Sequence, residues 1–186
     1  MRIIGGQYKG RKIETCEGPG YRPATMKVRE SIFSMLMARG IDFAQVRVID
    51  MFAGSGSLAI ECLSRGTTEA WFIEKSSKAA GLIRKNLNEL GVDKRCAKVV
   101  SKDVFGVLSK RPDAPFDLVF IDPPYGKDLL VSSLEKALKN GWIAPGALVL
   151  AEVESLIDAP EGGDIAEMEL LTDREYGQTR ILLWRN

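Results

Sequence analysis

The sequence predicts an α/β fold with one doubly wound, mostly parallel sheet, and two observations carry this prediction. From Val46 onward, short apolar runs alternate with helical stretches, and strands that alternate with helices form parallel sheets covered on both faces. The 186 residues are 45% hydrophobic and 27% charged, which is ordinary for a globular chain with a sizeable core. This excludes a disordered chain, a collagen-like repeat and a disulfide-stapled miniprotein, and the length fits one domain with a small appendage.

The appendage is expected at the start of the chain. Residues 2–4 and 11–14 predict a short hairpin around glycine-rich turns. Thr25 is placed to cap a helix over residues 26–39. Apolar side chains recur in that helix every three to four positions: Val28, Ile32, Phe33 and Leu36.

The main domain is expected over residues 42–186, after the N-terminal hairpin and helix of residues 1–41. Its predicted strands cover residues 46–52, 70–73, 97–100, 116–121 and 147–153. Its predicted helices cover residues 57–65, 76–90, 104–109 and 129–140. Two last strands, 168–171 and 179–184, flank Tyr176-Gly177 and predict an antiparallel hairpin that completes a seven-stranded sheet.

Composition also limits the chemistry and the compartment. The chain has no histidine, which excludes a Ser-His or Cys-His triad and a histidine-ligated zinc site, and we expect no metal. Its three cysteines are widely spaced and odd in number, as in a reduced cytoplasm. No apolar run is long enough to cross a bilayer, and the N-terminus lacks the apolar stretch of a signal peptide. We therefore expect a cytoplasmic protein without a membrane partner.

The charge is distributed unevenly although the net charge is only +1. Residues 1–29 hold seven basic and two acidic side chains, a net charge of +5, whereas residues 151–186 hold three basic and nine acidic ones, a net charge of −6. A basic arm on a neutral body indicates a polyanion reached by one face, and a solvated charged hairpin is the alternative. The basic residues proposed to contact this polyanion are Arg2, Lys9, Arg11, Lys12, Arg22 and Lys27.

A glycine loop follows the first predicted strand of the main domain. In Asp50-Met51-Phe52-Ala53-Gly54-Ser55-Gly56, the two glycines let the backbone turn tightly and approach a ligand at the carboxyl end of the strand. Glu74 ends the next strand, where a carboxylate can accept both ribose hydroxyls, and Asp103 ends the third, where it can take the adenine amino group. Asp50 would repel a dinucleotide's phosphates but suits the ammonium of S-adenosyl-L-methionine. We therefore favour that cofactor over NAD.

A second motif, Asp122-Pro123-Pro124-Tyr125, follows the fourth predicted strand. Two prolines stiffen the turn, which can aim one carboxylate, one backbone carbonyl and one aromatic ring into the cleft. An exocyclic amine needs these groups, because hydrogen bonds to Asp122 and to the Pro123 carbonyl free its lone pair while Tyr125 stacks on the base. Methylation of a pyrimidine carbon would instead need a cysteine at such a strand end, and the three cysteines lie elsewhere.

The motifs together resemble the RsmD family, bacterial methyltransferases that act on the N2 amine of one guanine in small-subunit ribosomal RNA. The resemblance rests on Met1–Gly6 with Lys9-Gly10-Arg11, on the segment Arg22-Pro23-Ala24-Thr25 to Phe33, on the glycine loop, on Asp122–Tyr125 and on Tyr176-Gly177. It spans nearly the whole chain. It implies a Rossmann-like class I methyltransferase fold with S-adenosyl-L-methionine as cofactor. It also implies that the basic N-terminal segment contacts RNA and that the substrate is an assembling or assembled small ribosomal subunit. We expect the protein to be a monomer.

Residue roles follow from the motifs and this resemblance together. The expected catalytic residues are Asp122, Pro123, Pro124 and Tyr125. The expected cofactor residues are Asp50, Phe52, Ala53, Gly54, Ser55, Gly56, Glu74, Lys75, Asp103, Val104, Thr25 and Arg29. The last two lie one helical turn apart and can share a face toward the cofactor cleft, or else form an N-cap and a solvated arginine.

Two other functions remain open from the sequence. The Asp-Pro-Pro-Tyr motif is shared with DNA adenine-N6 methyltransferases, so it does not by itself choose guanine over adenine. A non-catalytic RNA-binding assembly factor could retain the same cofactor fold, although the intact motif from Asp122 to Tyr125 argues against that function.

Overall fold

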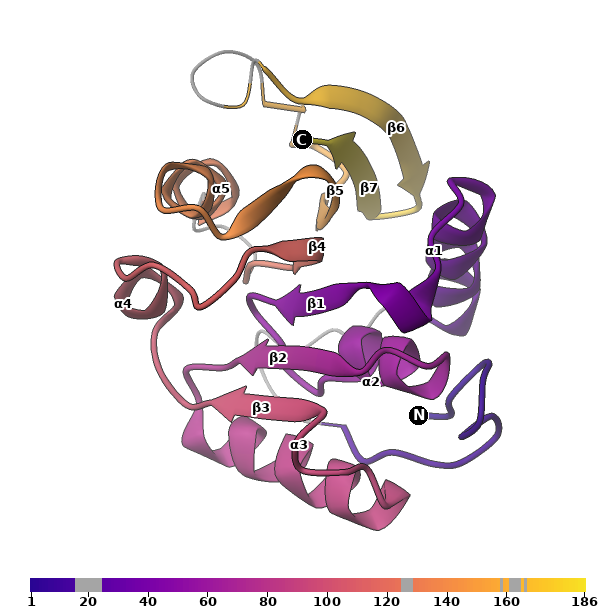
Figure 1. Ribbon diagram of the computed structural model, residues 1–186. Helices are drawn as coiled ribbons and strands as arrows, with labels where there is room; N and C mark the ends of the chain where they lie inside the picture. The colour runs from indigo at the N-terminus through magenta and orange to yellow at the C-terminus, as the bar shows by residue number, and fades with distance from the viewer. Residues whose placement is uncertain (16–24, 125–128, 158, 161–164, 166) are drawn as a thin grey trace.

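The protein is built around one seven-stranded sheet. Its structure, a computed structural model, describes residues 1–15, 25–124, 129–157, 159–160, 165 and 167–186. The strand order is β3-β2-β1-β4-β5-β7-β6, which Figure 1 shows from β3 at the bottom to β6 at the top. The strands are β1 (Arg47–Asp50), β2 (Glu69–Ile73), β3 (Ala97–Val100), β4 (Phe116–Ile121), β5 (Ile143–Glu154), β6 (Glu169–Tyr176) and β7 (Thr179–Arg185). The first five are parallel, and β7 is antiparallel to both β5 and β6. The predicted fold class is confirmed.

Helices cover both faces of the sheet, because side chains alternate between the two faces along each buried strand. The helices are α1 (Met26–Ala38), α2 (Ser57–Ser64), α3 (Ser77–Leu90), α4 (Val104–Leu108) and α5 (Leu129–Lys139), with a short 3-10 turn at Phe43–Gln45. On one face, the apolar side chains of α1, α2 and α3 pack on alternate strand residues such as Val48, Phe120 and Leu150. On the other face, α4 and α5 pack on residues such as Ile49 and Val119.

The N-terminal segment shares the first of these two cores. Ile3 and Ile13 are buried together with the predicted apolar positions of α1 and with residues of α2 and α3. Thr25 is the N-cap of α1, and its hydroxyl accepts from the Val28 amide at 3.3 Å. The predicted cap and apolar stripe of this helix are therefore confirmed.

Four predicted elements differ from the observed ones by more than one residue at an end. The first strand, β1, ends at Asp50 and not at residue 52. The N-terminal hairpin forms an isolated bridge, Arg2 with Lys12, in place of two strands, and backbone hydrogen bonds of Met1 with Ile13 and of Ile3 with Arg11 lie on either side of it. β5 begins at Ile143 because that residue pairs with Phe116 before a register shift near Leu118. β6 runs to Tyr176 rather than ending near residue 171. Its polar second half pairs fully with β7, and such edge pairing leaves no apolar signal.

The three tryptophans are core residues. Trp71 is 8% exposed, and Trp142 and Trp184 are each 2% exposed. Cys62 is also buried and free, and Cys16 lies outside the described residues. No helix in the described part of the chain is long and apolar enough to cross a membrane.

Candidate active site

Every parallel strand of the sheet carries a carboxylate at its carboxyl end. In the spatial order of the strands, from β3 to β5, these residues are Asp103, Glu74, Asp50, Asp122 and Glu152. We call this set the carboxylate row. Ligands of doubly wound sheets bind beyond the carboxyl ends of the strands, at the point where the strand order reverses, and here the reversal falls between β1 and β4. Asp50 and Asp122 flank that point.

The glycine loop between β1 and α2 is hydrogen-bonded to the carboxylate of Glu74. One oxygen of this carboxylate accepts from the Gly54 amide at 2.9 Å, and the other accepts from the Ser76 amide at 2.6 Å. Gly54 and Gly56 have φ angles of 53° and 76°, which favour glycine. A Cβ on Gly56 would also lie 3.2 Å from the Phe72 ring and from Ile83. The loop therefore needs glycine at both positions for its backbone conformation, and at Gly56 also for packing.

Asp50 is the most unusual group of the row. Its side chain is 2% exposed, and its Oδ1 has no hydrogen-bond partner among the residues that the structure describes. Burial, with a smaller contribution from the charge of Glu74, raises the pKa of Asp50 to about 7, although the Phe52 amide opposes the shift. A buried carboxylate that lacks a partner is costly and suits a cationic group. The ammonium of S-adenosyl-L-methionine is such a group, so the residues present fit this cofactor.

The other predicted cofactor residues lie around this loop. Asp103 caps α4 by accepting from the Phe105 amide at 3.0 Å, and the exposed ammonium of Lys75 lies 3.2 Å from its carboxylate. Val104 is 4% exposed and packs in the core, so little of its side chain is left for a ligand. Within the loop, Ala53, Ser55 and Gly56 are buried, whereas Phe52 and Gly54 are half-buried.

Asp122 and Glu152 are the two members of the row that lie beyond Asp50 as seen from Glu74. Burial raises the pKa of Asp122 well above its usual range, and the charges of Glu152 and Asp50 act in the same direction. Burial likewise raises the pKa of Glu152. Pro123 is buried and Pro124 half-buried, whereas Tyr125 lies outside the described residues. The predicted carboxylate and prolines therefore follow β4 directly at the edge of the sheet where the glycine loop begins.

Glu152 was not among the residues expected from the sequence. Its side chain is 3% exposed, and its Oε2 has no hydrogen-bond partner in the described part of the chain. The available signal was a single glutamate near the end of an otherwise apolar strand, between Ala151 and Val153. A charged side chain in a buried strand is uncommon without a partner or a function.

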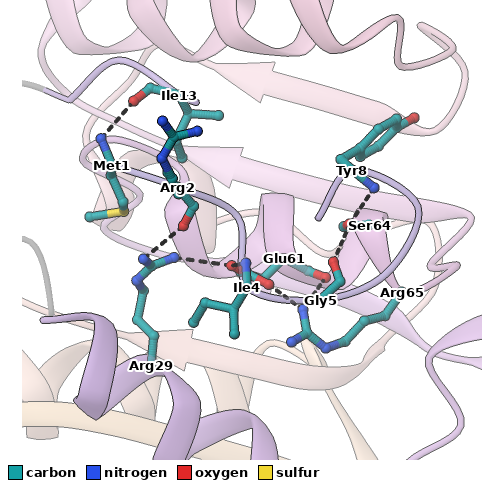
Figure 2. Close-up of polar contacts among 10 residues, drawn as sticks. All are labelled: Met1, Arg2, Ile4, Gly5, Tyr8, Ile13, Arg29, Glu61, Ser64 and Arg65. Carbon is teal, nitrogen blue, oxygen red and sulfur yellow. Dashed lines mark hydrogen bonds and ion pairs between the residues drawn. The ribbon is translucent and has the colours of Figure 1, made fainter. Parts of the chain in front are cut away.

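The sequence predicts that Arg29 either faces the cofactor cleft or is solvated, and the structure shows a third environment. Arg29 is 1% exposed, and its guanidinium donates to Glu61 Oε1 at 3.0 Å and to the Arg2 carbonyl at 2.9 Å (Figure 2). Glu61, itself fully buried in α2, also pairs with Arg65 and accepts from the Ile4 amide at 2.6 Å. Arg29 is therefore not solvated, and the contacts of its guanidinium are with Glu61, which it shares with Arg65, and with the Arg2 carbonyl. This network fastens the N-terminal segment and α1 to α2.

Among the described basic N-terminal residues, the arginines bond to backbone carbonyls and the lysines are exposed. Arg11 donates to the Leu90 carbonyl at 3.0 Å and to the Glu89 carbonyl, so it neutralises the C-terminal end of α3. Arg2 is exposed and donates to the Gly10 carbonyl at 2.7 Å within its own turn. The remaining members of the predicted set that the structure describes are exposed: Lys9, Lys12 and Lys27. Arg22 lies outside the described residues.

The sheet order, the antiparallel β7 and the glycine loop after β1 define a Rossmann-like class I methyltransferase fold. Solved structures from Escherichia coli and Thermus thermophilus superimpose with TM-scores of 0.84 and 0.80, at 34% and 28% identity. These matches cover 100% and 98% of this chain, and 97% and 98% of the two solved chains.

Residues 1–185 match the family described as "Conserved hypothetical protein 95". The chain is 38% identical over 154 residues to ribosomal RNA small subunit methyltransferase D of Escherichia coli strain K12. This match covers 83% of this chain and 75% of that protein. The chain is 35% identical over 155 residues to the protein of the same name from Haemophilus influenzae, covering 83% of this chain and 79% of that protein. The chain therefore belongs to this family, the RsmD family.

Proposed function

We propose that the protein transfers a methyl group from S-adenosyl-L-methionine to the exocyclic N2 amine of a guanine in small-subunit ribosomal RNA. The observation that carries the proposal is the carboxylate row, in which a cofactor half and an acceptor half meet between β1 and β4. Family relatives named as ribosomal RNA small subunit methyltransferases support the substrate class. A cytoplasmic location and a small ribosomal subunit as partner follow from this substrate.

The cofactor half comprises the glycine loop, Asp50, Glu74 and Asp103. When bound, S-adenosyl-L-methionine supplies an electrophilic methyl group on a sulfonium centre. Asp50 offers its unpartnered oxygen to the ammonium of the cofactor, and Glu74 presents a carboxylate to the ribose while it holds the Gly54 amide. Lys75 lies at the border of this half beside Asp103, Thr25 caps α1, and Arg29 acts only through the segment that it fastens.

The acceptor half comprises Asp122 and the two prolines. An exocyclic amine is a weak nucleophile because its lone pair is delocalised into the base. Hydrogen bonds from its two N–H groups to the Asp122 carboxylate and the Pro123 carbonyl favour a tetrahedral nitrogen and localise the lone pair. The same bonds stabilise ionised Asp122 against the burial that raises its pKa. Because the chemistry is a direct displacement, positioning is the main catalytic task.

The RNA is placed against the N-terminal segment. Lys9, Lys12 and Lys27 are exposed basic residues on or next to that segment, and the segment is fastened to α2 by the network of Arg29 and Glu61 (Figure 2). Exposed lysines neutralise phosphates without reading sequence. This face therefore contributes affinity, and the acceptor half chooses the base.

The test uses small subunits from cells that lack the endogenous enzyme, incubated with methyl-labelled S-adenosyl-L-methionine and then digested to nucleosides. N2-methylguanosine at one site would support the proposal. Label found only as N6-methyladenine in DNA would overturn the acceptor and the substrate. RNA binding without any transfer would indicate a non-catalytic assembly factor.

A matched pair of variants tests the role of Asp122. Asp122→Ala is expected to abolish transfer while the Kd for S-adenosyl-L-methionine, measured by calorimetry, stays within a few-fold of wild type. Asp93→Ala, which removes an exposed aspartate paired with Arg95, is the control and should retain both properties. Joint loss of transfer and cofactor binding in Asp122→Ala would contradict the role assigned to this carboxylate.

A further inference from the structure

Glu152 is the member of the carboxylate row that the proposed reaction has not used. It lies in β5, on the far side of Asp122 from the cofactor half, whose groups follow β1, β2 and β3. The base that presents its amine to Asp122 therefore has Glu152 as its next neighbour along the sheet edge. A structural role does not account for a charged side chain at this position.

The register of the sheet brings the two carboxylates together. Ile121 of β4 and Ala151 of β5 are direct partners in the parallel pairing, so Asp122 and Glu152 follow at adjacent positions. By the alternation of each strand, Glu152 lies on the same face as Leu150, which packs in the core beneath α1 and α2. Asp122 lies on the same face as Phe120, which belongs to that core too. The pair therefore shares one face of the sheet at its carboxyl edge.

Burial makes an unpartnered carboxylate at this place costly. Glu152 is 3% exposed, and among the described residues no donor reaches its Oε2. Leu150 on the same face and Ile181, the β7 partner of Glu152, are apolar and buried, so an apolar residue would stabilise the empty protein better. Burial raises the pKa of Glu152, and the nearby Glu152 charge contributes to raising that of Asp122. Among the described residues, Glu152 Oε2 therefore lacks a hydrogen-bond donor, which a ligand can supply.

The base-pairing edges of guanine and adenine differ at the atom beside the amine. In guanine the N2 amine is flanked by N1–H, a donor, whereas in adenine the N6 amine is flanked by N1, an acceptor. Asp122 and the Pro123 carbonyl accept from either amine, so they do not distinguish the two bases. A carboxylate next to them accepts from guanine N1–H and repels the lone pair of adenine N1.

We propose that Glu152 accepts a hydrogen bond from N1–H of the target guanine and thereby selects guanine over adenine, an inference that rests on the function proposed above. Asp122 with Pro123 positions the nitrogen to be methylated, and Glu152 reads the atom beside it. The selectivity comes from leaving a buried acceptor facing a lone pair in the wrong complex, which rejects an analogue more strongly than the loss of an apolar contact.

The test compares two bases that carry the same N2 amine. Once the methylated position is located by the nucleoside analysis above, small subunits are reconstituted with either guanine or 2,6-diaminopurine at that position. Diaminopurine keeps the N2 amine but has a lone pair at N1. Wild-type protein should prefer guanine in kcat/KM by about a hundredfold or more. In Glu152→Gln, whose amide can donate to N1, the preference should fall by about tenfold or more.

Two further variants separate selection from a structural role. Glu152→Asp retains a carboxylate and should keep the preference for guanine even where its rate falls. Glu135→Gln makes the same change at a half-buried side chain of α5, which packs on the opposite face of the sheet, and should leave the preference unchanged. The Kd for S-adenosyl-L-methionine, measured on every variant, confirms that each is folded.

A guanine preference in Glu152→Gln within twofold of wild type would overturn the inference. So would loss of transfer to both bases in a variant that binds cofactor normally, because glutamine can still accept from N1–H. Absence of N2-methylguanosine with wild-type protein is a different result, since it would refute the proposed function itself.

Discussion

Asp50→Asn is expected to change the stability of the cofactor-free protein in a pH-dependent way. The wild-type carboxyl has an ordinary pKa of 3.8 and a folded-state pKa of about 7, because burial and the charge of Glu74 both disfavour ionisation. A folded pKa above the unfolded value means that stability is complete below pH 3.8 and is lost as the pH rises through 7. Asparagine does not titrate, so the variant lacks this loss.

The magnitude follows from the size of the shift. A rise of about 3 pKa units corresponds to about 4 kcal/mol, at about 1.4 kcal/mol per unit. The free energy of unfolding of the variant relative to wild type should therefore rise by up to about 4 kcal/mol between pH 4 and pH 8. For a chain of this length, that change is worth about 8–16 °C in Tm. The pH-independent effect of the substitution cancels when the two pH values are compared.

The assay is denaturant unfolding of both proteins at several pH values without cofactor, with Asp93→Asn as a surface control that should show no comparable rise. In the same variant, loss of the charge-assisted bond to the ammonium should raise the Kd for S-adenosyl-L-methionine about 10–100-fold, for about 1.5–3 kcal/mol. A stability difference that is flat from pH 4 to pH 8 would refute the buried ionisation of Asp50. An unchanged Kd would refute its contact with the cofactor.

Three more predictions test the remaining parts of the site. Glu61→Ala leaves Arg29 buried without its partner and should destabilise the protein by about 3–5 kcal/mol in denaturant unfolding, and a cost below about 1 kcal/mol would make the network marginal. Glu74→Ala removes the acceptor of the Gly54 amide and should raise the cofactor Kd by about tenfold or more, whereas a wild-type Kd would place the ribose contact elsewhere. Replacing Lys9 and Lys12 together by glutamine should weaken RNA binding and flatten its salt dependence, and an unchanged salt slope would remove these residues from the RNA face.

Most of the fold could be predicted from the sequence because its signals are local. Alternating apolar runs and amphipathic stretches define the parallel strands and their helices, and Thr25 followed by an apolar stripe defines α1. The ends of β5 and β6 could not be predicted in this way. They depend on pairing with Phe116 and with β7, which are partners distant in the sequence.

The residues of the candidate site also differ in whether the sequence predicts them. Glu74, Asp103 and Asp122 each come just after a predicted strand, and Asp50 begins the glycine-loop motif near the end of one, so motif and position alone are enough to propose them. Glu152 sits inside a strand rather than after one, so only the pairing of β4 with β5 shows that it lies beside Asp122.

Arg29 shows most clearly what the tertiary structure decides. In the sequence it is one basic residue among several in a basic arm, and its helical position relative to Thr25 suggested a ligand-facing or solvated side chain. In the folded chain it is buried against Glu61, a residue 32 positions away, and it fastens the N-terminal segment to α2 (Figure 2). The spacing of apolar residues and the motifs at strand ends are properties of residues close together in the chain, so the sequence alone determines them. The partner of a charge is a property of the packed fold, because burial, which makes the pairing necessary, exists only there.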